Sequence, residues 1–222
     1  MKDSESTPRT IKVVRMILKE HSGTLLDIGC SDGRMTECFA KEGRRLFGFE
    51  LNQAEGAAAK DRGIDVLSGD LTGGLPSQWN GRDTTAMFDV VFAGEIIEHI
   101  EDTDRFLREI HRVLAPSGAL VITTPNLVSL ENRVRMLLGL YPLFVDYSKT
   151  DDNHVRAYTT RALAAQLKKN GFEIDELNGS WVPIVYSIFP RIDALLRPLT
   201  SKLADWLPGL AMHAVIKARR GR

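Results

Sequence analysis

Residues 25–33 read LLDIGCSDG, which predicts a buried strand that runs through a glycine turn into a helix. Gly29 and Gly33 lack a Cβ, so the backbone there can come close to a ligand. The start of the following helix presents free N–H groups to the same space. The stretch is neither a GxGxxG motif nor a turn ending in Gly-Lys-Ser/Thr, which disfavours a pyrophosphate ligand. The turn by itself predicts a nucleotide-like site and leaves its ligand open.

The alternation of buried strands and helices continues along the chain. Apolar runs bounded by turn residues predict strands, and apolar residues at three- and four-residue spacing predict helices. The strands are expected at 24–29, 44–50, 64–70, 88–94, 119–125, 172–177 and 210–218, with helices at 10–20, 54–62 and 102–114 and after Thr159 or Thr160. This order predicts an α/β fold: a doubly wound, Rossmann-like, seven-stranded and mainly parallel sheet with helices on both faces.

We expect one domain over residues 1–222, with residues 1–9 as a flexible tail. Residues 126–153 and 179–208 interrupt the alternation and predict apolar insertions over the active site that form a substrate cap. An apolar stripe from Ile188 to Leu207, interrupted by Pro190 and Pro198, fits core packing, a homodimer interface or a membrane surface. Residues that could line an acceptor cavity are Leu140, Tyr141, Leu143, Phe144, Trp181, Ile184, Tyr186 and Phe189.

Charge and composition exclude several classes of protein. The 29 basic and 29 acidic residues cancel, which removes the broad attraction to phosphates that nucleic-acid binders show. The polar start MKDSESTPRT is neither a secretory signal nor an anchor, and the two cysteines, Cys30 and Cys38, are expected to stay reduced. We therefore expect a cytoplasmic monomer or homodimer that acts on a small molecule, with peripheral membrane or lipid contact through 181–208 as an alternative.

Acidic residues end the second and third predicted strands. Glu50 comes some twenty residues after the glycine turn, where a carboxylate can accept both ribose hydroxyl hydrogens. Asp70 can accept a hydrogen bond from the amine of adenine. Together with the turn, these residues predict an adenosine site. The alternative is that they are ordinary strand-end and turn residues.

The series DIGCSDG, FGFE, GDL, FDVVFAGEIIEHIED and LAPSGALVITTPN resembles the motifs of class I S-adenosylmethionine-dependent methyltransferases, especially the "type 11" small-molecule group. The resemblance covers about 100 residues, and Ser31 departs from it where many members have glycine. It implies that Asp27 and the turn hold the methionine end, Glu50 the ribose and Asp70 the adenine. The implied cofactor-binding set is Asp27, Gly29, Cys30, Ser31, Gly33, Glu50, Leu51, Asp70, Leu71, Ala93 and Glu95.

The segment EIIEH follows the fourth strand and sets Glu95, Glu98 and His99 on one side of a predicted helical turn. With the distant His154, this pattern is similar to that of ubiquinone-pathway O-methyltransferases and small-RNA terminal 2′-O-methyltransferases. The similarity implies that Glu95, Glu98, His99 and His154 bind a divalent cation, which could be Mg²⁺, Mn²⁺, Fe²⁺ or Zn²⁺. Two alternatives remain: His99 and Glu95 act as catalytic residues without a metal, or the pair is structural.

The sequence thus predicts O-methylation of a hydroxylated small molecule that is quinone-like, lipid-linked or sugar-derived. One alternative is an RNA ribose 2′-O-methyltransferase, which the neutral charge balance opposes. Another is a non-catalytic cofactor-binding protein on the same scaffold. His21, His111 and His213 fall on predicted surface or remote elements and are given no role.

Overall fold

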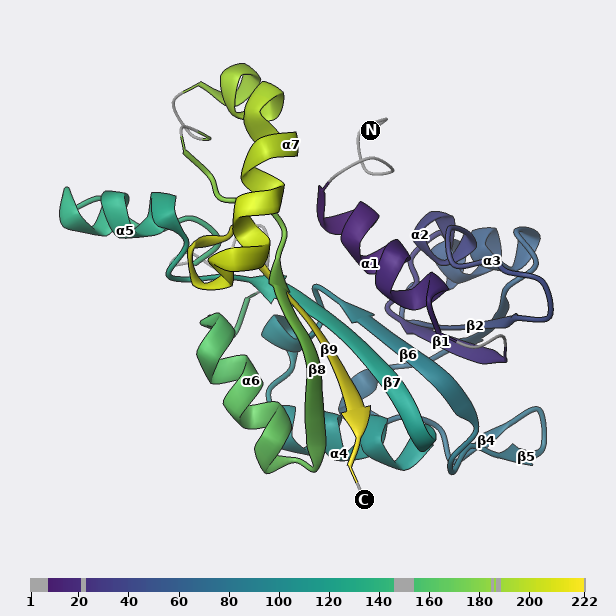
Figure 1. Cartoon of the computed structure of the whole chain (residues 1–222). Coiled ribbons are helices and arrows are strands. Elements are labelled where there is room, and N and C mark those ends of the chain that lie inside the picture. Colours follow the sequence, from purple (N-terminus) through teal and green to yellow (C-terminus); the bar gives the residue numbers. More distant parts are fainter. Residues whose placement is uncertain (1–7, 21–22, 146–153, 185, 187–188, 222) are drawn as a thin grey trace.

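Seven strands form one twisted sheet in the order β3-β2-β1-β6-β7-β9-β8 (Figure 1). The computed structural model describes residues 8–20, 23–145, 154–184, 186 and 189–221. The five strands β3, β2, β1, β6 and β7 are parallel to one another in the sheet. The strand β9 is antiparallel to both β7 and β8. The predicted mainly parallel, seven-stranded sheet is confirmed. Its strands are β1 (Thr24–Ile28), β2 (Arg45–Glu50), β3 (Asp65–Ser68), β6 (Phe88–Gly94), β7 (Leu114–Pro125), β8 (Phe172–Gly179) and β9 (His213–Arg220).

Helices cover both faces of the sheet, as the doubly wound prediction requires (Figure 1). Three of them, η1 to η3, are single 3₁₀ turns, and α2 is one turn long. The helices are α1 (Pro8–Leu18), α2 (Arg34–Glu37), α3 (Gln53–Asp61), η1 (Leu71–Gly73), η2 (Ile97–His99), α4 (Thr103–Val113), α5 (Leu130–Leu137), α6 (Thr160–Lys169), α7 (Pro190–Trp206) and η3 (Pro208–Leu210).

Each face of the sheet has its own apolar cluster, because successive residues of a strand point to opposite sides. On one face, Leu25 and Val90 belong to a buried cluster with Val13 of α1. On the other face, Leu26 and Val91 belong to a larger cluster that includes residues of α4 and α6. Burial on both faces explains why the central strands read as unbroken apolar runs.

Side chains cap several of the helices that pack on this sheet. Asn52 accepts hydrogen bonds from the first N–H groups of α3, Asp102 accepts one from α4, and Thr159 accepts one from α6. Each such cap contributes about 1 kcal/mol to helix stability. Of the pair Thr159 and Thr160, which the sequence left open, Thr159 is therefore the residue that caps α6.

A short hairpin between β3 and β6 was not predicted. Its strands β4 (Gln78–Trp79) and β5 (Arg82–Asp83) pair antiparallel around Asn80 and Gly81. Both turn residues have positive φ, 50° and 76°, which is the conformation that an Asn-Gly turn adopts in a tight hairpin. The Asn-Gly pair was the available signal, but no alternating apolar pattern flanks it.

The two predicted insertions contain the helices α5 and α7, which project from the edge where the parallel strands end (Figure 1). The expected interruption at Pro198 is wrong, since α7 is one helix of 17 residues, whereas Pro190 is the residue at which this helix begins. Pro190 occupies its first turn, where the missing N–H has no intrahelical partner, and Pro198 lies inside the helix. Within the described residues, no helix is both long enough and apolar enough to cross a bilayer.

Candidate cofactor and metal site

The turn after β1 depends on glycine at two positions. Gly29 has φ +75°, and a Cβ there would overlap the Cδ1 atom of Ile96. Gly33 has φ +80° and packs against Ala59, so a larger residue would push α3 away. Ser31 also adopts a left-handed conformation, with φ 49°, although it is not glycine. The conformation of this turn therefore requires residues without a Cβ at positions 29 and 33.

Glu50 connects this turn to the end of β2. Its Oε2 accepts a hydrogen bond from the Ser31 N–H at 2.8 Å, and its Oε1 accepts one from the Asn52 N–H at 2.8 Å. Each carboxylate oxygen has two lone pairs, so both can still accept a further hydrogen bond from a ligand. The backbone of the turn thereby fixes the direction of the carboxylate.

Asp70 follows β3 at the same edge. Its Oδ1 accepts a hydrogen bond from the Thr72 N–H at 2.8 Å, and this bond holds the pKa of Asp70 below its usual value. Glu50 and Asp70 line one cavity of about 550 Å³, which we call the nucleoside cavity. Gly29, Leu51, Leu71, Ile96 and His99 line it as well. The structure thus brings both acids to one space large enough for a nucleoside; their contact with a ligand stays a prediction.

A second cavity of about 560 Å³ meets the first at Gly29, and we call it the methionine cavity. It is lined by Asp27, Gly94, Glu95 and Arg9, among others. Asp27 is buried and accepts a hydrogen bond from Thr36 Oγ1 at 2.6 Å. Burial, with a smaller effect from the charge of Glu50, raises the pKa of Asp27 to about 7. An elongated ligand with a nucleoside at one end and an ammonium group at the other fits this pair of cavities.

Two members of the expected cofactor set have side chains that face the core. Cys30 packs among Ala59, Ile64 and Val66, and burial raises the pKa of its thiol to about 12. Ala93 is fully buried on the strand β6 and lines neither cavity. Cys30 still lines the methionine cavity although it is almost fully buried, and Gly94 and Glu95, the two residues after Ala93, line it as well.

Glu95 does not join the other three expected metal ligands. Its φ of 56° turns the chain before η2 begins at Ile97, so Glu95 is not on a helical turn with Glu98 and His99. Its carboxylate accepts a hydrogen bond from Thr123 Oγ1 at 2.7 Å and pairs with Arg9 Nη1 at 2.9 Å. The prediction that one helical face gathers all three residues is therefore wrong.

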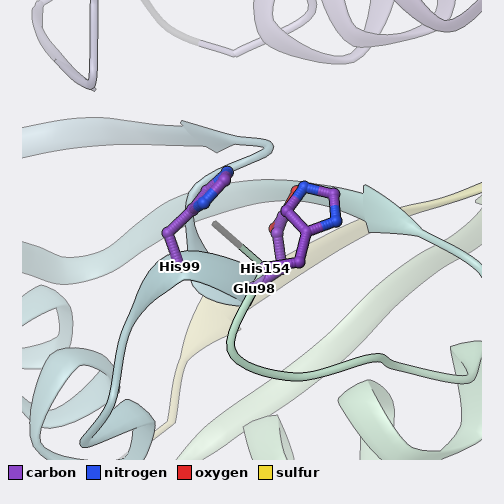
Figure 2. A group of neighbouring side chains, drawn as sticks. All are labelled: Glu98, His99 and His154. Atoms are coloured by element: carbon purple, nitrogen blue, oxygen red, sulfur yellow. The ribbon is translucent and has the colours of Figure 1, made fainter. Parts of the chain in front are cut away.

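Glu98, His99 and His154 do come together (Figure 2). Each offers one ligand atom, and these atoms lie within 4.8 Å of one another. The backbone carbonyl of Glu98 accepts hydrogen bonds from the N–H groups of Val155 at 2.9 Å and Arg156 at 3.3 Å. These two bonds hold the loop that carries His154 against η2, so His154 meets His99, which lies 55 positions earlier in the sequence.

The hydrogen bonds of this cluster suit a cation. His154 Nδ1 lies 3.0 Å from the Phe144 carbonyl oxygen, so it carries the proton and Nε2 keeps a lone pair. Glu98 Oε2 accepts a hydrogen bond from Thr124 Oγ1, while the buried Oε1 has no partner. Burial, followed by the charge of Glu95, raises the pKa of Glu98 to about 8. A buried carboxylate oxygen without a partner beside two imidazoles fits a divalent metal ion.

His213 and Arg9 reach the site although neither was expected there. His213 starts β9, and because β9 is antiparallel it begins at the edge where β6 and β7 end. Its Nε2 lies 3.7 Å from Glu95 Oε2, and Ser180 Oγ lies 3.1 Å from Nδ1. Burial lowers the pKa of His213 to about 4. Arg9 was assigned to a flexible tail but belongs to α1, and the polar composition of the preceding residues concealed this.

The expected acceptor cavity is not found among the described residues. Leu143 and Phe144 border a space of only about 10 Å³ beside Glu98 and His154. Trp181 is buried against His213 and Tyr186 instead. The remaining residues of that set are exposed, namely Leu140, Tyr141, Ile184 and Phe189. Part of the first insertion, residues 146–153, lies outside the described residues.

Comparisons with known proteins find methyltransferases. The sequence profile of the methyltransferase domain family matches residues 9–177. A Mycolicibacterium smegmatis protein described as an S-adenosylmethionine-dependent methyltransferase is 27% identical over 157 residues, which are 70% of this chain and 54% of the relative. The ubiquinone biosynthesis O-methyltransferase of Pseudomonas paraeruginosa is 29% identical over 107 residues, 46% of this chain and 44% of the relative. The chain thus spans about half the length of these relatives.

A solved structure shows the same fold. The 1,6-didemethyltoxoflavin-N1-methyltransferase of Burkholderia thailandensis, which contains S-adenosylhomocysteine, superimposes with a TM-score of 0.62 at 17% identity. The superposition covers 96% of this chain and 79% of that one. Because the family profile extends over most of the chain, from α1 into β8, the chain belongs to the class I S-adenosylmethionine-dependent methyltransferases.

Proposed function

We propose that this protein transfers the methyl group of S-adenosylmethionine to a hydroxyl group of a small molecule. The observation that carries the proposal is the pair of cavities that meet at Gly29, with Glu50 and Asp70 in one and Asp27 in the other. Glu98, His99 and His154 each direct a potential metal-ligand atom to one point, and His99 also lines the cavity that contains Glu50 and Asp70. The ubiquinone biosynthesis O-methyltransferase relative supports a hydroxyl acceptor, since its name describes methylation at oxygen.

Each residue has a task that follows from its position. Glu50 and Asp70 accept hydrogen bonds from the ribose and the adenine, and Asp27 faces the ammonium group of the methionine end. Gly29 gives the ligand room where the two cavities join. S-adenosylmethionine, when bound, supplies a methyl group that its sulfonium charge already activates. The protein therefore mainly has to place the acceptor oxygen in line and take up its proton.

We propose that Glu98, His99 and His154 hold a divalent cation that binds the acceptor oxygen. A cation there would orient the hydroxyl and lower its pKa. His154 is oriented for this role by the Phe144 carbonyl, and Glu98 by Thr124. Glu95 is a separate group that Arg9 and Thr123 hold toward the methionine cavity.

Calorimetric titration with S-adenosylhomocysteine tests the cofactor site. We expect the wild-type protein to bind, the Glu50→Gln variant to bind about tenfold more weakly or worse, and the Glu173→Gln variant on the exposed side of β8 to bind like wild type. Absence of binding by the folded wild-type protein would overturn the cofactor proposal.

Methyl transfer is tested with S-adenosylmethionine labelled in the methyl group and 3,4-dihydroxybenzoate as a simple two-hydroxyl probe. We expect label on a phenolic oxygen of the probe. Label that enters total RNA and leaves the phenol untouched would replace the small-molecule proposal with the RNA alternative.

The metal proposal has its own measurement. We expect Mn²⁺ to bind the wild-type protein in calorimetry and its electron paramagnetic resonance signal to broaden. The His154→Ala variant should no longer bind Mn²⁺, whereas the His111→Ala variant, whose substitution is remote on α4, should bind Mn²⁺ like wild type. If S-adenosylhomocysteine binds but Mn²⁺ does not, the cation proposal fails and His99 becomes the proton acceptor at the nucleoside cavity.

A further inference from the structure

The helix α7 exposes an apolar stripe to solvent. Ile192, Leu195, Leu199, Leu203 and Trp206 follow one another at spacings of three and four residues, which places them within an arc of about 80° on the helix. All five are exposed, and Leu195, Leu199 and Trp206 are 80%, 69% and 86% exposed. A single exposed leucine needs no explanation, but a continuous stripe over four turns does.

The opposite side of α7 shows that the usual polarity of a surface helix is reversed. The residues that α7 buries are Asp193, Thr200 and Ala204, which are polar or small. Val182 of the incoming loop accompanies Ala204 in a small cluster under the helix. A surface helix normally buries its apolar stripe and exposes its polar side. In α7 the apolar side faces outward, so packing among the described residues does not account for it.

The charges beside the stripe are basic. Arg191 and Lys202 lie next to it on the helix circumference, and both are exposed without an ion pair among the described residues. The other charged residues of α7 are paired: Arg197 with Asp193, and Asp205 with Lys12 of α1. The unpaired charge that borders the stripe is therefore positive on a chain whose net charge is zero.

The position of α7 leaves its stripe accessible. The helix projects from the edge of the sheet that also bears the candidate site (Figure 1). It lies outside residues 9–177, the part of the chain that the family profile matches. Lys12 of α1 contacts α7 at Ser201 and Asp205, which lie away from the stripe, so the stripe itself stays open.

We propose that α7 docks on the surface of an anionic lipid bilayer, with its apolar stripe among the acyl chains and Arg191 and Lys202 at the lipid phosphates. An apolar stripe flanked by basic residues is the pattern of a helix that lies in the interface plane. At 17 residues the helix is about 26 Å long and carries charges, which suits lying on a bilayer and not crossing it. A second copy of the chain fits less well, because a symmetric pair would bring the same basic residues together. The proposal does not depend on methyl transfer.

Vesicle flotation tests the proposal. We expect the wild-type protein to float with vesicles of phosphatidylcholine and phosphatidylglycerol at 3:1, and to float much less with phosphatidylcholine alone. Raising the salt from 0.1 to about 0.5 M should weaken the binding, because salt screens the charges. The Arg191→Gln/Lys202→Gln variant should lose the preference for anionic vesicles.

Matched variants separate docking from folding. Leu195→Glu/Leu199→Glu should lower the partition coefficient more than about tenfold with an unchanged thermal midpoint, since both side chains are exposed. Ile11→Glu/Leu18→Glu, on the exposed side of α1, should float like wild type. Tryptophan emission gives a second readout, because Trp79 and Trp181 are only 1% and 6% exposed and a blue shift on adding vesicles reports Trp206.

Three results would overturn the proposal. The first is wild-type protein that stays at the bottom with both kinds of vesicle, and the second is a Leu195→Glu/Leu199→Glu variant that floats like wild type. The third is a wild-type protein that does not float but is a dimer in light scattering, together with a Leu195→Glu/Leu199→Glu variant that is a monomer. That third result would assign the stripe to a second copy of the chain.

Discussion

One backbone torsion at Glu95 determines which side chains its carboxylate meets. Its φ is 56°, and its carboxylate accepts a hydrogen bond from Thr123 and lies beside Arg9 and His213. The pKa of Glu95 stays below its usual value, because burial, which raises it, is outweighed by the interactions with His213 and Arg9 and by the Thr123 hydrogen bond. The site therefore holds two neighbouring acids in different states, with Glu95 ionised and Glu98 inclined to keep a proton.

Gly29→Ala should damage both stability and cofactor binding. The new Cβ would overlap Ile96 in a left-handed backbone conformation, so we expect a loss of about 1–3 kcal/mol in the free energy of unfolding. The affinity for S-adenosylhomocysteine should fall at least about tenfold, because the overlap lies where the two cavities meet. Urea unfolding and calorimetry measure the two effects. Gly209→Ala is the control, since a Cβ there meets no atom within 4 Å; equal behaviour of the two variants contradicts the prediction.

His213 should make the protein lose stability in mild acid. Its pKa is lowered from 6.5 to about 4 by burial, with Glu95 opposing this and Arg9 adding to it. The neutral form is favoured in the folded state, so this stabilisation is present above pH 6.5 and disappears as the pH falls toward 4. Its size is on the order of 3 kcal/mol.

Nuclear magnetic resonance of the imidazole should show His213 still neutral at pH 5, and unfolding free energies at pH 7 and 4.5 should differ less in His213→Gln than in wild type. The Lys19→Gln variant, whose side chain is exposed at the end of α1, is the control. A His213 titration midpoint near 6.5 contradicts this prediction.

At the scale of elements, Lys12 connects three parts of the fold. Its Nζ donates hydrogen bonds to the carbonyls of Gly179 and Ser201 at 2.6 Å and pairs with Asp205. It thereby joins α1 to the end of β8 and to α7. The placement of Arg9, three residues earlier on α1, depends on the same contacts.

Lys12→Met should therefore cost about 1–3 kcal/mol of unfolding free energy, because two carbonyls and a carboxylate lose their donor. Lys19→Met, whose side chain is exposed at the end of α1, should leave stability unchanged within about 0.5 kcal/mol. Thermal unfolding of the two variants side by side measures the difference. A Lys12→Met midpoint equal to that of wild type would show that other contacts hold α1.

The elements of the sheet could be predicted because burial on both faces leaves a continuous apolar run, as in β6 and β7. The hairpin β4–β5 was not predicted, because two-residue strands are too short to show an apolar pattern, although Asn80-Gly81 marks the turn. The continuity of α7 through Pro198 escaped because a proline lowers helix propensity locally, whereas neighbouring contacts decide the outcome. Local sequence therefore predicted elements that are buried and missed elements that tertiary contacts stabilise.

S-adenosylhomocysteine should raise the free energy of unfolding of the protein. At one hundred times its dissociation constant, a ligand that binds only the folded state adds about 2.7 kcal/mol. For a chain of 222 residues this corresponds to a rise in the thermal midpoint of about 5–10 °C. NAD⁺ is the control, because its pyrophosphate has no matching glycine motif in this chain. A rise with NAD⁺ and none with S-adenosylhomocysteine contradicts the assignment of the two cavities.

The cofactor residues Gly29, Glu50 and Asp70 could be placed from sequence because parallel strands end at one edge, so residues that follow them gather there. The direction of the Glu95 side chain could not be predicted, since a single left-handed residue produces no periodic pattern in the sequence. His213 could not be found either, because its position depends on β9 running against its neighbours. Sequence order showed where strands end and not which strand reverses.

The reversed strand β9 also has a consequence for biosynthesis. It is the last of the seven strands along the chain, yet it lies between β7 and β8. While the ribosome is still translating residues 213–220, β7 and β8 each present an open edge of unpaired backbone, which can recruit other nascent chains. The sheet therefore closes only after translation has passed β9. A message cut short before that point should yield an aggregating product, with the glycine turn and both acids already in place.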